Sequence, residues 1–184
     1  MKILDLGCGT RKHPEAIGLD MNPGVHPDVL HEVRDRNLLP FEDNLFDKVY
    51  MIDFLEHVDD PEWILSEVHR VSKSDAEVNL QYPHYNCPDN YSDITHRHRL
   101  GIHCLEHYDP TTEFGKMFRY YKKFGRNFQY KIEKIDTTFP DSFPGRMSRF
   151  LMARMGPNIY ERHISCFLPI KNIQARLRVL KEKN

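Results

Sequence analysis

The chain has 184 residues, a length that suits one well-packed domain. Its formal net charge of −1 at pH 7 provides no long-range field that would draw it to nucleic acid or to a membrane surface. Charged residues make up 29% and aromatic residues 11% of the chain, as in folded rather than disordered proteins. We therefore expect a single domain over residues 1–184, with no nucleic-acid partner and no membrane partner.

The N-terminal segment and the cysteines indicate the cellular compartment. Asp5 interrupts the first apolar segment, so a signal peptide is not expected, and no apolar run approaches membrane-spanning length. The cysteines lie far apart with no CxxC pair, which favours reduced thiols in a cytoplasmic protein. They are Cys8, Cys87, Cys104 and Cys166.

The first part of the chain alternates short apolar segments with turn residues, which predicts strands. The segments are MKILDL (1–6), EAIGLD (15–20), PDVLHEV (27–33) and FDKVYMID (46–53). A helix is expected over 59–71, because Asp60 can cap it and Pro61 suits its first position. The alternating segment EVNLQYP (77–83) predicts a fifth strand.

The second part of the chain predicts two more helices and two more strands. A helix over 109–125 is expected to begin after Asp109 and to stop at Gly125. The other expected elements are strands over 128–136 and 172–180 and an amphipathic helix over 143–156. The long connections 84–108 and 137–171 are expected on the ligand-binding side, as an active-site loop and a lid.

The segment LDLGCGT places a glycine turn directly after the first strand. Gly7 and Gly9 allow the backbone to bend and to approach a ligand closely. Lys12 stands where a dinucleotide fold has its third glycine, and the phosphate-loop pattern GxxxxGK[ST] is absent. An acid at Asp20 suits the paired hydroxyls of a ribose. The turn therefore fits a nucleoside ligand without a pyrophosphate or triphosphate.

Three phrases in order, LDLGCGT, GLD and RDRNLLPFEDNLFDKVYMIDFLEH, resemble the class I S-adenosylmethionine-dependent methyltransferases. The resemblance covers residues 1 to about 83 and is to the small-molecule, type 11-like branch, with a shortened first helix. It implies an α/β fold with a doubly wound, mostly parallel, seven-stranded Rossmann-like sheet. It also implies helices on both faces and an antiparallel last strand.

The resemblance also implies roles for single residues. Asp20 would hold the ribose hydroxyls with Met21 beside the adenine, and Asp35 would accept from the adenine amino group. Asp53 and Phe54 would lie beneath the methyl donor. The methionine portion would lie against Asp5, Gly7, Cys8 and Gly9.

Other interpretations of these residues stay open. Asp5 and Asp20 could cap the turn, Asp35 could be a solvated loop acid, and Glu32 competes with it. Arg11, or Lys12, could neutralise the cofactor carboxylate. His57 is expected to be a packing or helix-start residue.

The segment 84–107 is rich in histidine and also carries Cys87 and Cys104. We expect His84 and His96 to orient or deprotonate an acceptor; alternatively, they only hold the loop together by hydrogen bonds. A metal site is considered because imidazole and thiolate bind zinc, but without a CxxC or HExxH pair we predict none.

The expected function is methyl transfer from S-adenosylmethionine to a small-molecule acceptor, with S-adenosylhomocysteine as product. Since the donor is already activated, the protein must mainly align the reactants and exclude water. One alternative is a catalytically silent cofactor-binding or partner-binding domain of the same fold. Another is a metal-dependent enzyme that uses the segment 84–107. The helix over 143–156 could cover the core, act as a lid or dock a partner.

Overall fold

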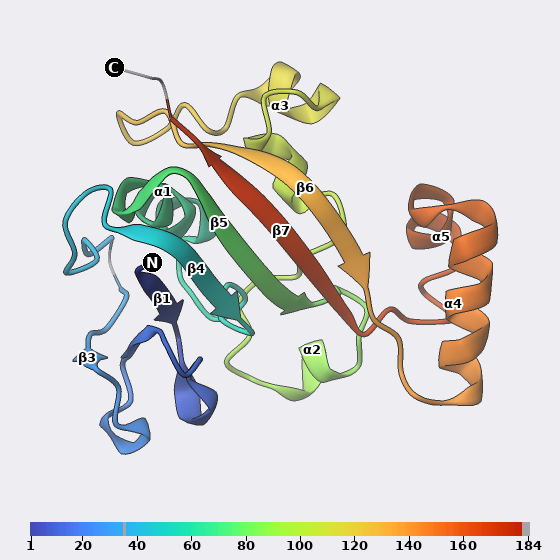
Figure 1. Cartoon of the computed structure of the whole chain (residues 1–184). Helices are drawn as coiled ribbons and strands as arrows, with labels where there is room; N and C mark the ends of the chain where they lie inside the picture. The colour runs from blue at the N-terminus through green and yellow to red at the C-terminus, as the bar shows by residue number, and fades with distance from the viewer. Residues whose placement is uncertain (35, 182–184) are drawn as a thin grey trace.

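The computed structural model describes residues 1–34 and 36–181. Its strands form one sheet of seven, in the order β3-β2-β1-β4-β5-β7-β6 (Figure 1). Strands β1 to β5 pair in parallel, whereas β7 runs antiparallel to both β5 and β6. The expected fold class is therefore confirmed. The strands are β1 (Ile3–Leu6), β2 (Ile17–Asp20), β3 (Val29–Leu30), β4 (Phe46–Ile52), β5 (Ser72–Pro83), β6 (Gln129–Thr137) and β7 (Asn172–Leu180).

Five α-helices and three 3-10 segments connect the strands in the described part of the chain. Helix α1 begins as expected: Asp60 accepts the backbone N–H of Trp63 at 3.0 Å, and Pro61 takes the first position. None of the described helices is both long and apolar enough to cross a membrane. The segments are α1 (Pro61–Val71), α2 (Asp89–Ser92), α3 (Glu113–Phe118), α4 (Phe143–Met155), α5 (Pro157–His163), η1 (Gly9–Arg11), η2 (Pro23–Val25) and η3 (Cys104–Tyr108).

The expected helix over 109–125 is wrong in extent. Only α3 forms there, capped by Thr112 rather than by Asp109, and it ends at Arg119, whose φ of 51° is left-handed. Asp109 is buried and accepts the backbone N–H of Ile132 on β6 at 2.8 Å. Its other carboxylate oxygen accepts from the backbone N–H and the hydroxyl of Thr111, so Asp109 closes the turn before α3 instead of capping the helix. The expected third strand is likewise shorter, and only β3 remains of it.

The main core lies on one face of the sheet. Along β5 the side chains of Val78 and Leu80 are buried, whereas Asn79 between them is partly exposed. Helix α1 covers the buried side, where the hydroxyl of Tyr130 on β6 donates to the carbonyl oxygen of Leu65 at 2.7 Å. This alternation is typical of strands with one buried and one wetter face.

On the other face, a short turn covers β1 where a full helix was not available. Residues 9–11 form η1, and His13 then stacks on Tyr50 of β4 with ring centroids 4.7 Å apart. The backbone N–H of His13 also donates to Asp5 at 2.8 Å. All four residues of β1 are buried as a result.

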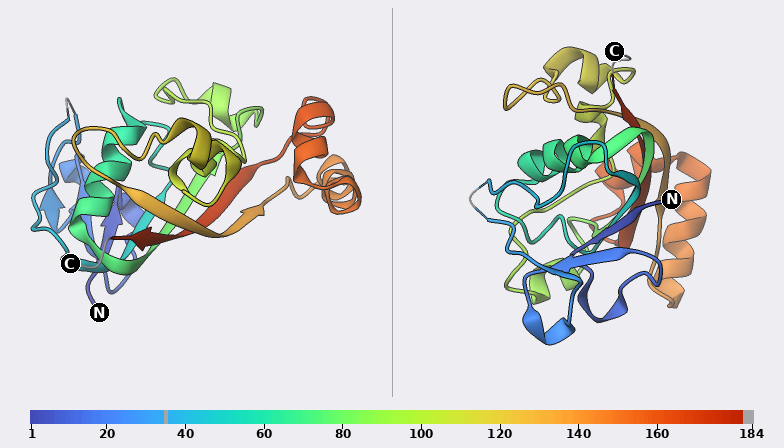
Figure 2. Two further views of the ribbon diagram at one scale, coloured as in Figure 1. Left: turned by 90° about the horizontal axis from the view of Figure 1, so that it is seen from above. Right: turned by 60° about the vertical axis from the view of Figure 1, so that its left-hand side comes forward.

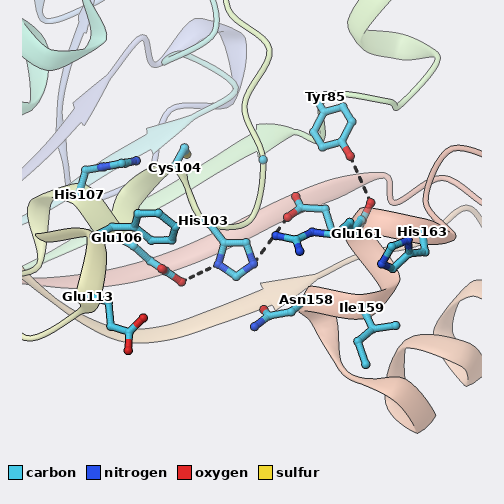
Figure 3. Close-up of a pocket in the computed structure, with 13 residues that line it drawn as sticks. Tyr85, His103, Cys104, Glu106, His107, Glu113, Asn158, Ile159, Glu161 and His163 are labelled. Carbon is cyan, nitrogen blue, oxygen red and sulfur yellow. Dashed lines mark hydrogen bonds and ion pairs between the residues drawn. The ribbon is translucent and has the colours of Figure 1, made fainter. Parts of the chain in front are cut away.

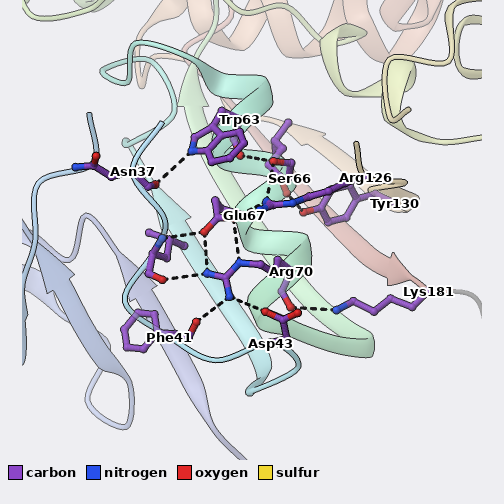
Figure 4. Close-up of polar contacts among 12 residues, drawn as sticks. Asn37, Phe41, Asp43, Trp63, Ser66, Glu67, Arg70, Arg126, Tyr130 and Lys181 are labelled. Atoms are coloured by element: carbon purple, nitrogen blue, oxygen red, sulfur yellow. Dashed lines mark hydrogen bonds and ion pairs between the residues drawn. The ribbon is translucent and has the colours of Figure 1, made fainter. Parts of the chain in front are cut away.

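A polar network anchors α1 to the segment that precedes β4 (Figure 4). Glu67 is buried, and its carboxylate accepts from Arg70, from Arg126 and from the backbone N–H of Leu39. Arg70 in turn donates to the carbonyl oxygen of Phe41 at 2.8 Å. The buried charge is thus compensated on every side, as buried carboxylates require.

Helices α4 and α5 project beyond the sheet, next to the ends of β6 and β7 (Figures 1 and 2). Both β5 and β6 run antiparallel to β7, so the carboxyl ends of β5 and β6 lie at the same edge. The helices leave from this edge. In doubly wound sheets, that edge is where ligands bind.

Candidate functional site

The turn after β1 depends on glycine at residue 7. Gly7 has a φ of 72°, which L side chains rarely adopt, and a Cβ built on it would lie 2.3 Å from Cδ2 of Phe54. The backbone N–H of Gly7 donates to the carbonyl oxygen of Leu19 on β2 at 2.8 Å. Any side chain at residue 7 would therefore strain the backbone and displace the Phe54 ring.

Asp20 ends β2 and closes the turn from the other side. One of its carboxylate oxygens accepts the backbone N–H of Gly9 and the other that of Asn22, each at 2.9 Å. A carboxylate has about four lone-pair positions, so these two contacts orient Asp20 and leave it able to accept from a ligand. Asp20 is partly exposed.

Asp5 and Cys8 lie beneath the turn rather than in an open cavity. Asp5 is 6% exposed and accepts the backbone N–H of His13. Burial raises the pKa of Asp5 and also that of the Cys8 thiol. This arrangement favours the turn-capping interpretation for Asp5, which supports the turn from below.

A cavity of about 650 Å³ opens between the turn, the end of β4 and the loop after β5. We call it the turn cavity. Its volume is within the usual range of small-molecule sites, about 300–1,000 Å³. It is lined by Gly7, Leu19, Asp20, Met21, His31, Val33, Arg34, Asp53, Phe54, His57, Val58, Asp59, Ile94, Thr95 and Arg97.

Several of the predicted cofactor residues meet in the turn cavity: Gly7, Asp20, Met21, Asp53 and Phe54. Asp5, Cys8 and Gly9 are not in its lining. Asp35 lies outside the described residues, so its predicted contact with adenine stays a prediction.

A second cavity of about 750 Å³ adjoins the first at Asp53, His57 and Ile94, which line both. We call it the loop cavity because much of its wall comes from the segment 89–96. Lys171 and Asn172, at the start of β7, close it on another side. Its remaining lining residues are Arg11, Glu56, Gln81, Pro83, Asp89, Ser92, Asp93 and His96.

Arg11 and Lys12 have different surroundings, although they are neighbours in sequence. Lys12 donates to Asp28 at 2.7 Å, and the same carboxylate oxygen accepts the backbone N–H of Gly18. Arg11 instead lines the loop cavity. Of the two, Arg11 is therefore the one that lines this cavity.

Asp53 marks the boundary between the two cavities and has an unusual backbone. Its φ of 52° lies in the left-handed region, which few residues other than glycine adopt. Its carboxylate accepts from the side-chain amide of Gln81 at 3.2 Å and 3.3 Å. Non-glycine residues held in such conformations are concentrated at functional sites.

The two histidines predicted to act on an acceptor lie in different environments. His84 is 0% exposed; its Nδ1 lies 2.6 Å from Asn86 Oδ1, and its Nε2 lies 3.0 Å from Glu161 Oε1. These contacts favour the loop-holding interpretation for His84. His96 lines the loop cavity, and its Nδ1 lies 3.1 Å from Asn90 Oδ1.

Glu56 is a residue of the loop cavity that the sequence analysis did not select. Its carboxylate is 1% exposed, and neither oxygen has a hydrogen-bond partner among the described residues. Burial raises the pKa of Glu56 to about 7. The sequence signal is the phrase LEH at 55–57, in which only His57 is given an expected role, as a packing or helix-start residue.

A third cavity, of about 720 Å³, lies farther along the segment 101–107 and is bounded by α5 (Figure 3). His103 Nδ1 lies 2.6 Å from Glu106, and its Nε2 lies 3.6 Å from Glu161. Helix α5 was not expected from the sequence. Its signal is Gly156 followed by Pro157 at the first helical position.

Comparison with known proteins supports the N-terminal motifs and the fold. Residues 4–79 match the family model described as "Methyltransferase domain". No curated protein sequence matches the chain.

Among solved structures, a SAM-dependent methyltransferase from Archaeoglobus fulgidus has a TM-score of 0.59 at 19% identity, covering 96% of this chain and 85% of that chain. An S-adenosylmethionine-dependent methyltransferase from Mesorhizobium loti has a TM-score of 0.56 at 16% identity, covering 96% and 90%. The [4+2]-cyclase SpnF has a TM-score of 0.55 at 15% identity, covering 98% and 76%. At these identities the comparison shows the fold alone, and the fold is compatible with more than one reaction.

Proposed function

We propose that the chain transfers a methyl group from S-adenosylmethionine to a small-molecule acceptor, and the match of residues 4–79 to the family model described as "Methyltransferase domain" is the premise. The observation that carries the proposal is the turn cavity. It brings a carboxylate, an apolar wall and the glycine turn together at the carboxyl ends of β1, β2 and β4. Ligands of doubly wound sheets bind at this place.

The residues of the turn cavity fit an adenosine-linked sulfonium. Asp20, held by the backbone N–H of Gly9, has lone pairs left for the two ribose hydroxyls. Met21 and Val33 provide apolar surface for an adenine ring. S-adenosylmethionine, when bound, supplies an activated methyl group on a positively charged sulfur.

The loop cavity is the proposed acceptor site. The loop cavity adjoins the turn cavity at Asp53, which lines both. An acceptor held in the loop cavity would therefore lie next to a donor in the turn cavity. Its wall is polar and carries both signs of charge, since Lys171 as well as Asp89 and Asp93 line it. These side chains suit a small polar acceptor that must be held in one orientation.

Calorimetric titration with S-adenosylhomocysteine tests the donor site. We expect Asp20→Asn to weaken binding about 10–100-fold, because hydrogen bonds to a charged group contribute about 1.5–3 kcal/mol. Asp28→Asn is the matched control, because the carboxylate of Asp28 also accepts a backbone N–H, that of Gly18, but Asp28 does not line the turn cavity. No binding by folded wild-type protein, or equal binding by both variants, would contradict the proposal. Transfer of a labelled methyl group to a metabolite pool then tests the reaction itself.

A partner-binding domain of the same fold is the second candidate, and one observation favours it. Three aromatic side chains in and after the projecting helices are exposed: Phe143 by 69%, Phe150 by 62% and Phe167 by 81%. Exposed apolar groups of this kind can mark an interaction surface. If S-adenosylhomocysteine binds but no acceptor is methylated in the pool, this candidate is preferred.

A further inference from the structure

Three side chains converge where the turn cavity meets the loop cavity, and the proposed function uses none of them. Glu56 and His57 follow the end of β4, and His96 comes from the loop after β5. One ligand-type atom from each lies within 4.8 Å of the others. The set joins two parts of the sequence that are 39 residues apart.

The carboxylate of Glu56 has no hydrogen-bond partner in the part of the chain that the structure describes. It is 1% exposed, and neither oxygen accepts a hydrogen bond from a described residue. A buried carboxylate in this state is costly, and native structures rarely leave one uncompensated. Asp53 and Asp93 lie close enough to add further negative charge. A bound cation would compensate this buried negative charge.

The hydrogen bonds around His57 leave a lone pair on its Nε2. The hydroxyl of Thr95 donates its only proton to Asp93 Oδ1 at 2.6 Å, since a carboxylate oxygen only accepts. Thr95 Oγ1 must then accept from His57 Nδ1, which lies 2.9 Å away. In a neutral imidazole with a proton on Nδ1, the other nitrogen is free to bind a metal ion.

The same reasoning applies to His96 through a different residue. Asn90 is fully buried, and its side-chain NH2 donates to the carbonyl oxygen of His84 at 3.2 Å. The amide oxygen of Asn90 therefore faces His96 Nδ1 at 3.1 Å and accepts its proton. The Nε2 of His96 keeps its lone pair, because the nearby Asp93 Oδ2 lies 3.7 Å away, beyond hydrogen-bond distance. Hydrogen bonds of this kind, which set the tautomer, are usual around metal-binding histidines.

We propose that Glu56, His57 and His96 form a binding site for a divalent transition-metal ion or zinc. Two imidazole nitrogens and one carboxylate oxygen suit Zn²⁺, Fe²⁺ or Co²⁺, whereas Mg²⁺ and Ca²⁺ prefer oxygen alone. Ligand bonds of about 2.0–2.2 Å require the three atoms to approach by small side-chain rotations. Three protein ligands leave coordination positions open toward the loop cavity.

The position of the ion, if the proposed methyl transfer holds, indicates the class of acceptor. An ion at the junction of the two cavities would bind an oxygen of the acceptor next to the methyl donor. Metal ions lower the pKa of a bound hydroxyl, whose proton then passes to solvent. The acceptor is therefore a small molecule with a hydroxyl group.

Binding of Co²⁺ and Zn²⁺ to the full chain, purified without a histidine tag and treated with chelator, tests the site. We expect about one equivalent of Co²⁺ per chain, with a visible d–d absorption band of the bound ion that differs from that of Co²⁺ in water. Glu56→Gln and His96→Asn should each weaken binding on the order of 100-fold, and Thr95→Val about tenfold, because it disturbs only the orientation of His57. His103→Asn is the matched control, since His103 lies in the same histidine-rich segment and contacts Glu106 instead.

Two outcomes overturn the metal site: no stoichiometric Co²⁺ binding by the wild type, or equal binding by wild type and Glu56→Gln. Thermal unfolding of the metal-free variants shows that they are folded, and Glu56→Gln should be at least as stable as the wild type, because it removes an unpaired charge. The result is separable from the proposed function. Co²⁺ binding without S-adenosylhomocysteine binding leaves the metal site and removes the methyltransferase proposal, and the reverse result does the opposite. Chelator-sensitive methylation of hydroxyl acceptors, but not of amines, supports the acceptor class, and the opposite preference overturns it.

Discussion

The imidazole Nε2 of His84 lies 3.0 Å from the carboxylate oxygen Oε1 of Glu161, across 77 residues of sequence. The same oxygen accepts the backbone N–H of Ile102 at 2.7 Å. Burial raises the pKa of Glu161, but the hydrogen bonds from His84 and Ile102 more than reverse this, and the pKa lies below its usual range. One acid thus joins the end of β5, the following loop and α5.

We expect this pair to act as one structural unit. His84→Asn and Glu161→Gln should each lower the free energy of unfolding by about 2–3 kcal/mol, because each leaves a buried polar group without its partner. The double variant should lose little more than either single one. Urea unfolding measures all three. Additive losses would contradict the pair, and His163→Asn on the same helix is the control.

The network around Glu67 leads to a second prediction, on stability. Glu67 is buried and compensated by Arg70 and Arg126, so Glu67→Ala should cost about 3–5 kcal/mol by leaving two cations without their carboxylate. Glu133→Ala is the matched control, because Glu133 forms a surface pair with Arg178. Its loss should cost about 1 kcal/mol or less. Similar costs for the two variants, measured by urea unfolding, would show that the network does not stabilise the fold.

The burial of His69 leads us to predict a loss of stability in mild acid. Burial lowers the pKa of His69 to about 4, and its Nε2 lies 2.9 Å from the carbonyl oxygen of Leu180. Between the ordinary pKa of about 6.5 and the lowered value, the unfolded chain binds a proton that the folded chain does not. The stability that depends on a neutral, buried His69 is therefore fully present above pH 6.5 and is lost as the pH falls toward 4.

The measurement is urea unfolding at pH 7.5 and pH 5.0. From the two pKa values we expect His69 to account for about 2 kcal/mol of the loss between these pH values. His69→Gln should reduce the pH dependence by about that amount, whereas His26→Gln, at an exposed position, should not change it. An unchanged slope in His69→Gln would assign the acid sensitivity to other groups.

The sequence predicted elements well where a local pattern and the tertiary contacts agree. The alternation of apolar and polar residues over 172–180 matches β7, because this strand has one buried and one exposed face. Asp60 and Pro61 mark the start of α1 for the same reason: the cap is a contact within one turn. Local rules suffice for such contacts.

Predictions from the sequence were wrong where a residue contacts a partner far away in the chain. Asp109 resembles a helix cap, but it accepts from Ile132 on β6. Phe114 and Phe118 have helical spacing, yet they pack around His107 and remain 42% and 45% exposed. No pattern within a short window carries such information.

The candidate site also contains residues that the sequence reveals and residues that only the fold brings together. The glycine turn and Asp20 are contiguous enough to be found from motifs. The cluster of Glu56, His57 and His96 is not, because His96 reaches the other two only when the loop after β5 folds back over the end of β4. Metal-binding spacing in the sequence therefore gave no indication of it.

Arg11 carries the last prediction, which concerns the amino-acid end of the cofactor. Arg11 lines the loop cavity, whereas Lys12 beside it is held by Asp28 at 2.7 Å. We therefore expect Arg11→Ala to weaken S-adenosylhomocysteine binding about tenfold, by loss of a charge-assisted hydrogen bond to the carboxylate. Lys12→Ala should leave the affinity nearly unchanged.

Comparison of two ligands locates the effect. Methylthioadenosine has the same adenosine and thioether but no carboxylate, so calorimetry should show equal affinity for wild type and Arg11→Ala. A tenfold loss for S-adenosylhomocysteine with none for methylthioadenosine assigns Arg11 to the carboxylate. An equal loss for both ligands would instead mean that Arg11 supports the turn itself, since only a change in the turn would reach the adenosine portion held by Asp20.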